Sequence, residues 1–261
     1  MADAKTSSSV RANALRGAVG TPMRNTWTIA RREFRGYFNS PMGYIIIATF
    51  TLLLSVLFFF LFGFLVLRRA TMQPLFTSIS WLLPLLCAAI SMRTFAEEKR
   101  LGTMELLITM PIRDGEVIIG KFLGAIGLLA ATLLATVVFP VAVSRMGDLD
   151  MGPVWGGYVG LLLGGGAYIA VGMLVSSYSK DQISSFFIAF FLGYIFFLLD
   201  KGLIFLGTSR MVSILEYLCF DFHFKSIARG VIDSRNVIFF ASVISACLLA
   251  TARSLDSRRW G

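Results

Sequence analysis

Residues 43–67 read GYIIIATFTLLLSVLFFFLFGFLVL and contain no charged side chain. About 20 apolar residues in a helix are enough to cross the hydrocarbon core of a bilayer, so this stretch predicts a membrane-spanning helix. Five more apolar stretches follow it along the chain. Together they predict an all-α integral membrane protein with six transmembrane helices, at about residues 43–67, 75–92, 118–143, 154–178, 183–199 and 236–252.

The composition supports this fold class. The 261 residues are 56% hydrophobic and 15% charged, whereas a soluble domain is about 25% charged. A buried helix in a soluble protein can be equally apolar, but six such stretches in one chain favour a membrane protein. The fifth and sixth stretches are the shortest.

The formal net charge of +9 could indicate nucleic-acid binding, so the distribution of the basic residues matters. With six spans and the N-terminus inside, 16 of the 24 Lys and Arg residues fall on the cytoplasmic side and 8 on the outer side. This split follows the positive-inside rule and predicts that both termini are cytoplasmic. The positive charge is therefore interpreted as an orientation signal, and no nucleic-acid partner is expected.

Two segments precede the first span. Residues 1–24 are rich in Ala, Ser and Arg and predict a disordered cytoplasmic tail, although an organelle transit peptide has a similar composition. In residues 25–38, aromatic side chains share one helical face with arginines beside it. This pattern predicts an interfacial amphipathic helix in the headgroup plane, with its aromatic face toward the membrane. Its candidate residues are Trp27, Arg31, Arg32, Phe34 and Arg35.

The segment between the second and third spans predicts a short helix–turn–helix at the cytoplasmic surface. Residues 97–100 are consecutive charges, followed by Gly102 and Thr103. Glycine is typical of a helix C-terminus, and threonine is typical of the N-terminus of the next helix. We refer to residues 94–112 as the elbow.

Residues 115–122, GEVIIGKF, resemble a phosphate-binding loop because two glycines precede a lysine. Such a loop follows a strand and ends in Ser or Thr, whose hydroxyl binds magnesium. Here Phe122 takes the hydroxyl position, Glu116 would repel phosphate, and the segment continues into an apolar span. No nucleotide site is expected, and Gly120 and Gly124 are assigned to close helix packing.

Gly156, Gly160 and Gly164 repeat every four residues in the fourth span. Small residues at this spacing predict a groove in which another helix packs closely, and a ligand path along the smooth face is the alternative. Between the fifth and sixth spans, residues 202–235 contain apolar runs around single charges, which predicts short outer re-entrant helices.

Residues typical of an active or metal site are sparse. The single histidine, His223, lies near Cys219 and Asp221, but a closed zinc site needs four protein ligands. The spans have no ionisable residue near their centres, which disfavours an ion-coupled carrier. The chain is therefore not expected to be an enzyme, and neither a metal nor a cofactor is assigned to it.

Several stretches outside the spans resemble ABC-2 type permeases, the six-span membrane subunits of bacterial ATP-driven exporters. The similar stretches are WTIARREFRGYFNSPMGY at 27–44, FAEEKRLGTMELLITMPI at 95–112, GKFLG at 120–124, FDFHFKSIARGVID at 220–233 and the final SRRW. The resemblance is closest to permeases associated with gliding motility. It implies that residues 25–261 form one ABC-2 type transmembrane domain.

The resemblance also implies partners and a location. A separate ATP-binding subunit would hold ATP and Mg and would contact the interfacial helix and the elbow. Two such subunits and two permease chains, identical or different, would form the working exporter in the bacterial inner membrane. A non-transporting anchor in a motility or secretion machine is the alternative function. The elbow residues implied for coupling are Glu97, Glu98, Arg100, Gly102, Thr103 and Glu105.

Overall fold

The computed structural model describes residues 22–61, 71–102, 114–145, 147–203, 217, 219–230 and 233–256. All regular secondary structure in these residues is helical, and no strand occurs among them. The all-α prediction is confirmed. The elements are α2 (Pro22–Asn39), α3 (Met42–Val56) with its π-helical end η1 (Leu57–Leu61), α5 (Gln73–Ser91), α6 (Ala96–Arg100), α8 (Asp114–Ala135), α9 (Val138–Ser144), α10 (Met151–Tyr178), α11 (Gln182–Leu203), α13 (Phe220–Ala228) and α14 (Ser234–Asp256).

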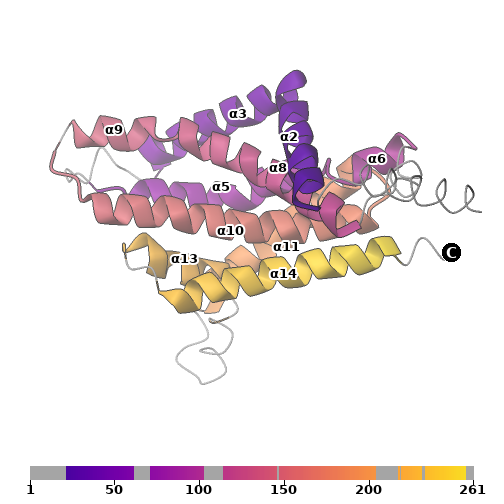
Figure 1. Cartoon of the computed structure of the whole chain (residues 1–261). Helices are drawn as coiled ribbons and strands as arrows, with labels where there is room; N and C mark the ends of the chain where they lie inside the picture. Colours follow the sequence, from indigo (N-terminus) through magenta and orange to yellow (C-terminus); the bar gives the residue numbers. More distant parts are fainter. Residues whose placement is uncertain are drawn as a thin grey trace, which may run out of the picture.

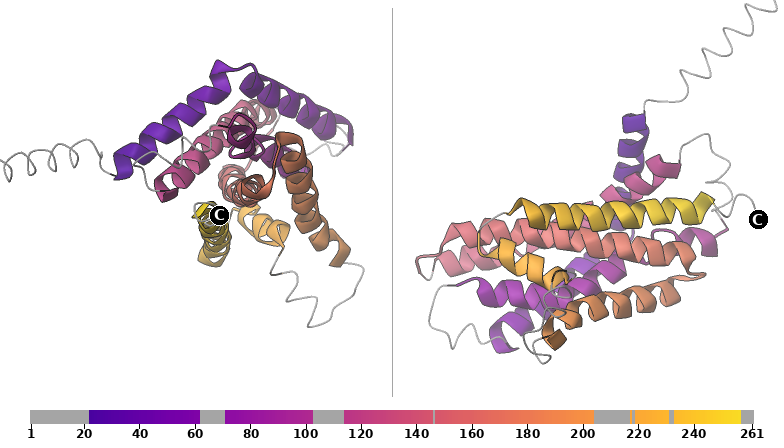
Figure 2. Two further views of the ribbon diagram at one scale, coloured as in Figure 1. Left: turned by 90° about the vertical axis from the view of Figure 1, so that its right-hand side faces the viewer. Right: turned by 90° about the horizontal axis from the view of Figure 1, so that it is seen from below.

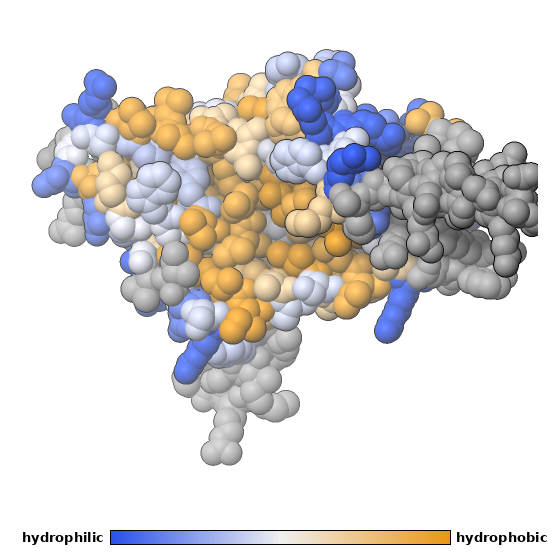
Figure 3. Space-filling view, in the orientation of Figure 1, coloured by the Kyte–Doolittle hydropathy of each residue, from blue (hydrophilic) through white to orange (hydrophobic). Residues whose placement is uncertain are grey.

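Six helical stretches are long and apolar enough to cross a membrane, and they follow the order of the predicted spans. On the surface, apolar side chains form a band between two hydrophilic ends (Figure 3). The protein is therefore a multi-pass membrane protein. The six stretches are Met42–Leu61, Gln73–Arg100, Asp114–Ser144, Met151–Tyr178, Gln182–Leu199 and Ser234–Leu255. Residues 62–67 of the first predicted span lie outside the described residues.

α10 is the central helix and packs against α5, α8, α11, α13 and α14 (Figure 1). Within their apolar stretches, 72% of the residues of α5 and α10 are buried, against 17–22% for α3, α11 and α14. A helix that is apolar on all sides is typical of such a central position. The three outer helices turn most of their apolar surface away from the protein.

Glycines allow α13 to lie close to α10. A Cβ added at Gly156 would lie 2.5 Å from the carbonyl oxygen of Ile227, and one at Gly160 would lie 3.1 Å from the ring of Phe224. At Gly164 the nearest atom, on Phe240, would be 3.8 Å away, an ordinary contact. The first two glycines of the repeat are therefore required by close packing, and the third is not.

The predicted third span, 118–143, lies within the apolar stretch Asp114–Ser144, and the structure adds a break in its helix. α8 ends at Ala135, and α9 begins at Val138 after a turn. Pro140 is the reason, because it has no N–H to donate to the carbonyl four residues earlier, at Thr136. That carbonyl accepts from the N–H of Phe139 instead, at 3.0 Å.

The bundle has two ends that differ in their elements. The α6 end contains α6, the start of α8 and the ends of α10 and α14, and the α13 end contains α13 and the starts of α5, α10 and α14 (Figures 1 and 2). α2 runs across the bundle axis instead of along it (Figure 1). α13 is a short helix between the fifth and sixth spans, and residues 204–216 of the same segment lie outside the described residues.

Candidate functional site

A buried lysine joins three helices at the α6 end. Lys121 lies in α8 and is only 4% exposed. Its Nζ lies 2.9 Å from Oε1 of Glu33 on α2 and 2.8 Å from Oε1 of Glu98 on α6. The ammonium also lies 5.6 Å from the ring centroid of Phe95, which is a cation–π contact. Buried charges are normally paired, so this ion-pair cluster ties α2, α6 and α8 together.

α2 reaches Lys121 because glycines let it approach α8 closely. A Cβ added at Gly120 would lie 2.7 Å from Cγ2 of Ile29, and one at Gly124 would lie 2.7 Å from Cβ of Glu33. Residues four apart on a helix share a face, so both glycines belong to the same contact surface. Larger side chains there would push α2, and with it the Glu33 carboxylate, away from α8.

A second ion pair fixes the start of the elbow. Arg93 donates from Nε to Oε2 of Glu97 at 2.7 Å and from Nη2 to Oε1 at 3.0 Å, a bidentate geometry. The guanidinium also lies 5.9 Å from the ring centroid of Tyr37 on α2.

Burial raises the pKa of the Tyr37 phenol, so its hydroxyl stays protonated. It donates to the carbonyl oxygen of Ile90 at 3.1 Å.

The elbow is also bonded to the end of α10. The N–H groups of Phe95 and Ala96, at the start of α6, donate to Oγ of Ser176 at 3.2 and 3.0 Å. Lys99 donates from Nζ to the carbonyl oxygen of Ser179 at 2.9 Å. A cation at a helix C-terminus also interacts favourably with the helix dipole. α6 is therefore held directly by α8 and α10, and it is linked to α2 through Lys121.

The predicted coupling residues fall into three groups. The carboxylates of Glu97 and Glu98 are used in ion pairs inside the chain, whereas Arg100 is exposed. Gly102 ends α6 with a φ of +70°, a conformation that favours glycine. The remaining two, Thr103 and Glu105, lie outside the described residues.

The predicted aromatic face of α2 meets protein more than membrane. Only Trp27 is strongly exposed, at 67%, and Phe34 is half-buried. Ala30 and Tyr37 are buried, and the backbone of Ala30 and Phe34 lies beside Gly124 of α8. The face that was expected toward the membrane therefore packs in part against protein, because α8 covers it at Gly124. The exposed side of α2 carries the predicted arginines, Arg31, Arg32 and Arg35.

Sequence reasoning missed the residues that hold the elbow in place. Lys121 entered only through the rejected phosphate-loop pattern and the GKFLG stretch, Lys99 only as part of a run of charges, and Glu33, Arg93 and Ser176 were given no role. The available signal was a lysine at the start of an otherwise apolar span. A charge at such a position requires a partner.

The three candidate metal ligands near α13 do not converge. His223 is buried, with Nδ1 2.7 Å from Oδ1 of Asn236 and Nε2 3.0 Å from the carbonyl oxygen of Tyr217. Asp221 instead pairs with lysines. Among the described residues, no group of three or more His, Cys, Asp or Glu side chains could hold a metal ion.

Comparison with known proteins gives one family. Residues 27–216 match the model of a family described as ABC-2 family transporter protein. The match covers well over half of the chain, from α2 through α11, and so includes the Lys121 ion-pair cluster. No curated protein matches the chain significantly.

Proposed function

Since the chain belongs to the ABC-2 family of transporter proteins, we propose that it is the permease subunit of an exporter driven by a separate ATP-binding subunit. Family and fold together make it a multi-pass membrane subunit of an ABC transporter. We propose in addition that the transporter exports its substrate and that the ATP-binding subunit is coupled to this chain through the α6 end. ATP and Mg would be held by the ATP-binding subunit and not by this chain.

The observation that carries the proposal is the attachment of α6 to three other helices. A partner that displaces α6 would pull on α8 through Lys121 and on α10 through Lys99, and through Lys121 it would also act on Glu33 of α2. Each link involves a charged group, and separating one buried member of an ion pair from the other leaves a charge without its partner, which is costly. Motion at the elbow would thus reach the second, third and fourth spans together.

The docking charges would come from arginines. Glu97 and Glu98 are already paired within the chain, so they hold the elbow in shape. Exposed guanidinium groups remain on α2 and α6 to meet acidic side chains of the ATP-binding subunit. Desolvated charge pairs between proteins contribute about 1.5–7 kcal/mol. The residues concerned are Arg31, Arg32, Arg35 and Arg100.

The orientation follows from the same arginines. Positive charge concentrated at the α6 end favours the cytoplasmic side for that end. α2 begins and α14 ends there, so both termini would face the cytoplasm (Figure 1). In this orientation, the exposed Trp27 would lie among the lipid headgroups of the bacterial inner membrane.

A second permease chain, identical or different, would complete the pathway. The outer helices offer apolar faces for it, and one stripe on α11 is formed by Phe187, Phe191 and Ile195, which are 51–60% exposed. Residues four apart share a helix face. Two permease chains and two ATP-binding subunits would then form the exporter.

Affinity purification of the chain from its native membrane tests the proposal. We expect an ATP-binding subunit to co-purify in equal copies, and its ATP hydrolysis to drive movement of a labelled compound in reconstituted vesicles. Recovery without any ATP-binding subunit would refute the proposal. Co-purification with hydrolysis but no transport of any compound would favour the alternative of an anchor in a motility or secretion machine.

A further inference from the structure

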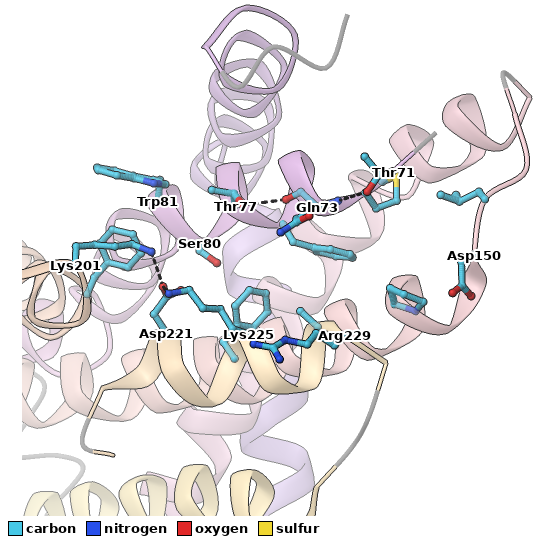
Figure 4. A pocket seen from close by; sticks show the side chains of 17 residues that line it. Thr71, Gln73, Thr77, Ser80, Trp81, Asp150, Lys201, Asp221, Lys225 and Arg229 are labelled. Carbon is cyan, nitrogen blue, oxygen red and sulfur yellow. Dashed lines mark hydrogen bonds and ion pairs between the residues drawn. The ribbon is translucent and has the colours of Figure 1, made fainter. Parts of the chain in front are cut away.

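A cavity of about 570 Å³ opens at the α13 end, between the starts of α5 and α10, the end of α11, and α13 (Figure 4). Its size falls within the range of about 300–1,000 Å³ that is usual for small-molecule sites. The cavity lies at the opposite end of the bundle from the elbow. It therefore needs an explanation separate from coupling.

One wall of the cavity is aromatic. Phe76 and Trp81 come from α5, Phe197 from α11 and Phe224 from α13. The rings of Trp81 and Phe197 meet edge to face, with centroids 5.1 Å apart. Trp81 is 37% exposed, so part of its indole surface is open to a ligand. These rings would accept an apolar body such as an alkyl chain.

Charged side chains, cationic and acidic, lie along the rim of the cavity. Asp221 accepts from Lys201 at 2.7 Å and from Lys225 at 3.0 Å, so one carboxylate serves two ammonium groups. Asp150 accepts from the N–H of Gly152 and caps α10.

Arg229 also lines the cavity and is exposed, and it has no ion-pair partner among the described residues. In Figure 4 it projects from α13 beside Lys225. Among the described residues that line the cavity, Lys201, Lys225 and Arg229 are cationic, and Asp150 and Asp221 are acidic.

We propose that the cavity binds an amphiphile with one anionic head group, a carboxylate or a phosphate ester. Its apolar body would lie against Phe76, Trp81 and Phe197, and its head group against Arg229 and Lys225. The exposed guanidinium of Arg229 is suited to an anionic head group. The inference goes beyond coupling to an ATP-binding subunit and stands whether or not that coupling exists.

Trp81 provides a local readout for binding. The full-length chain carries four tryptophans, and replacing Trp27, Trp155 and Trp260 by Phe leaves Trp81 alone. This chain, in phosphatidylcholine nanodiscs, is titrated with bromododecanoate, whose bromine quenches indole emission, and with bromododecanol of equal length. We expect saturable quenching, at least tenfold tighter for the carboxylate. Equal affinities, or quenching that rises linearly without saturation, would overturn the proposal.

Charge variants locate the head group. Arg229→Gln should weaken carboxylate binding about fivefold, as expected for one partly exposed charge contact. Arg145→Gln is the matched control, because Arg145 is exposed near the same end but does not line the cavity. Asp221→Asn, which removes a negative charge from the rim, should tighten binding. Should Asp221→Asn fail to fold, Lys225→Gln replaces it and should weaken binding. An unchanged affinity in both Arg229→Gln and Lys225→Gln would refute the site.

Two sources of the ligand give different results. If a bilayer lipid is the ligand, brominated phosphatidylglycerol in the nanodisc quenches Trp81 and bromododecanoate competes with it poorly. If a soluble amphiphile is the ligand, added bromododecanoate quenches and the brominated lipid does not. Either outcome supports an anionic amphiphile site, whereas quenching by neither probe contradicts it.

Discussion

Lys121 is a charged side chain that the fold can bury only because two carboxylates surround it. With 4% exposure, its ammonium depends on Glu33 and Glu98 in place of water. Removing one member of a buried ion pair leaves the other member poorly solvated. Lys121 therefore links α2, α6 and α8, although it is too buried to contact a partner protein directly.

Lys121→Met keeps the length of the side chain and removes its charge. We expect the free energy of unfolding to fall by about 2–4 kcal/mol, because Glu33 and Glu98 lose their cation. Thermal unfolding in detergent, followed by tryptophan fluorescence, measures the loss. Lys180→Met, at an exposed position of the same end, is the control and should change little. Equal melting temperatures for Lys121→Met and the native chain would contradict the claim that Lys121 stabilises the fold by linking the three helices.

Asp221 gives a pH dependence at the α13 end. Burial alone would raise the pKa of its carboxyl, but hydrogen bonds from Lys201 and Lys225 outweigh burial and hold the pKa below its usual range. The folded state thus favours the charged form. The stabilisation is complete above the unfolded pKa, about 3.9, and is lost as the pH falls through the lower folded pKa.

The native chain should therefore be more stable than Asp221→Asn by a constant margin from pH 8 to about 5, and this margin should shrink below about pH 4. Thermal unfolding across this range is the measurement. A margin that persists unchanged down to pH 3 would show that Asp221 stabilises the fold by something other than its charge.

At the scale of elements, the contact between α2 and α8 decides where the elbow is anchored. It depends on small residues on α8, as the close approach of Ile29 to Gly120 and of Glu33 to Gly124 makes clear. α2 is thereby a part of the bundle and not only a helix resting on lipid.

Gly124→Ala should destabilise the protein by about 1–3 kcal/mol through overpacking against α2. Gly36→Ala is the matched control, since Gly36 lies inside α2 with open space around it. There alanine should stabilise the helix by about 0.5–1 kcal/mol. In thermal unfolding, we expect the melting temperature to fall for Gly124→Ala and to rise for Gly36→Ala. Stabilisation by both substitutions would mean that α2 and α8 are not closely packed.

Sequence patterns predicted where the helices lie better than they predicted what each helix packs against. Apolar length predicted six spans, but it could not show that Pro140 breaks the third, although the proline itself was visible. Periodicity placed Phe34 and Tyr37 of α2 on one face, yet lipid and protein are both apolar, so the pattern could not tell which of them this face meets. The ion pairs of Lys121 join residues far apart in sequence and have no local signature.

At the scale of the whole molecule, the two ends serve different purposes in our proposal. The α6 end gathers arginines and the elbow, and the α13 end contains the amphiphile cavity. The central α5 and α10 run between the two ends and are largely buried.

Cysteine labelling should reveal the orientation of the bundle. In a chain whose native cysteines are replaced by Ala, Arg145→Cys should react with a membrane-impermeant maleimide in intact spheroplasts. Lys180→Cys should react only after the membrane is opened, because we propose that the α6 end faces the cytoplasm, as the positive-inside rule favours. The reverse pattern would invert the proposed topology.

ATP hydrolysis by the lipid-reconstituted complex, measured beside the chain alone, tests the coupling proposal most directly. The triple variant Arg31→Glu, Arg32→Glu and Arg35→Glu is compared under the same conditions. We expect no hydrolysis by the chain alone, hydrolysis by the native complex, and loss of both the ATP-binding subunit and its stimulated activity in the triple variant. Hydrolysis by the chain alone, or a triple variant that keeps its partner and the native rate, would contradict coupling through the α6 end.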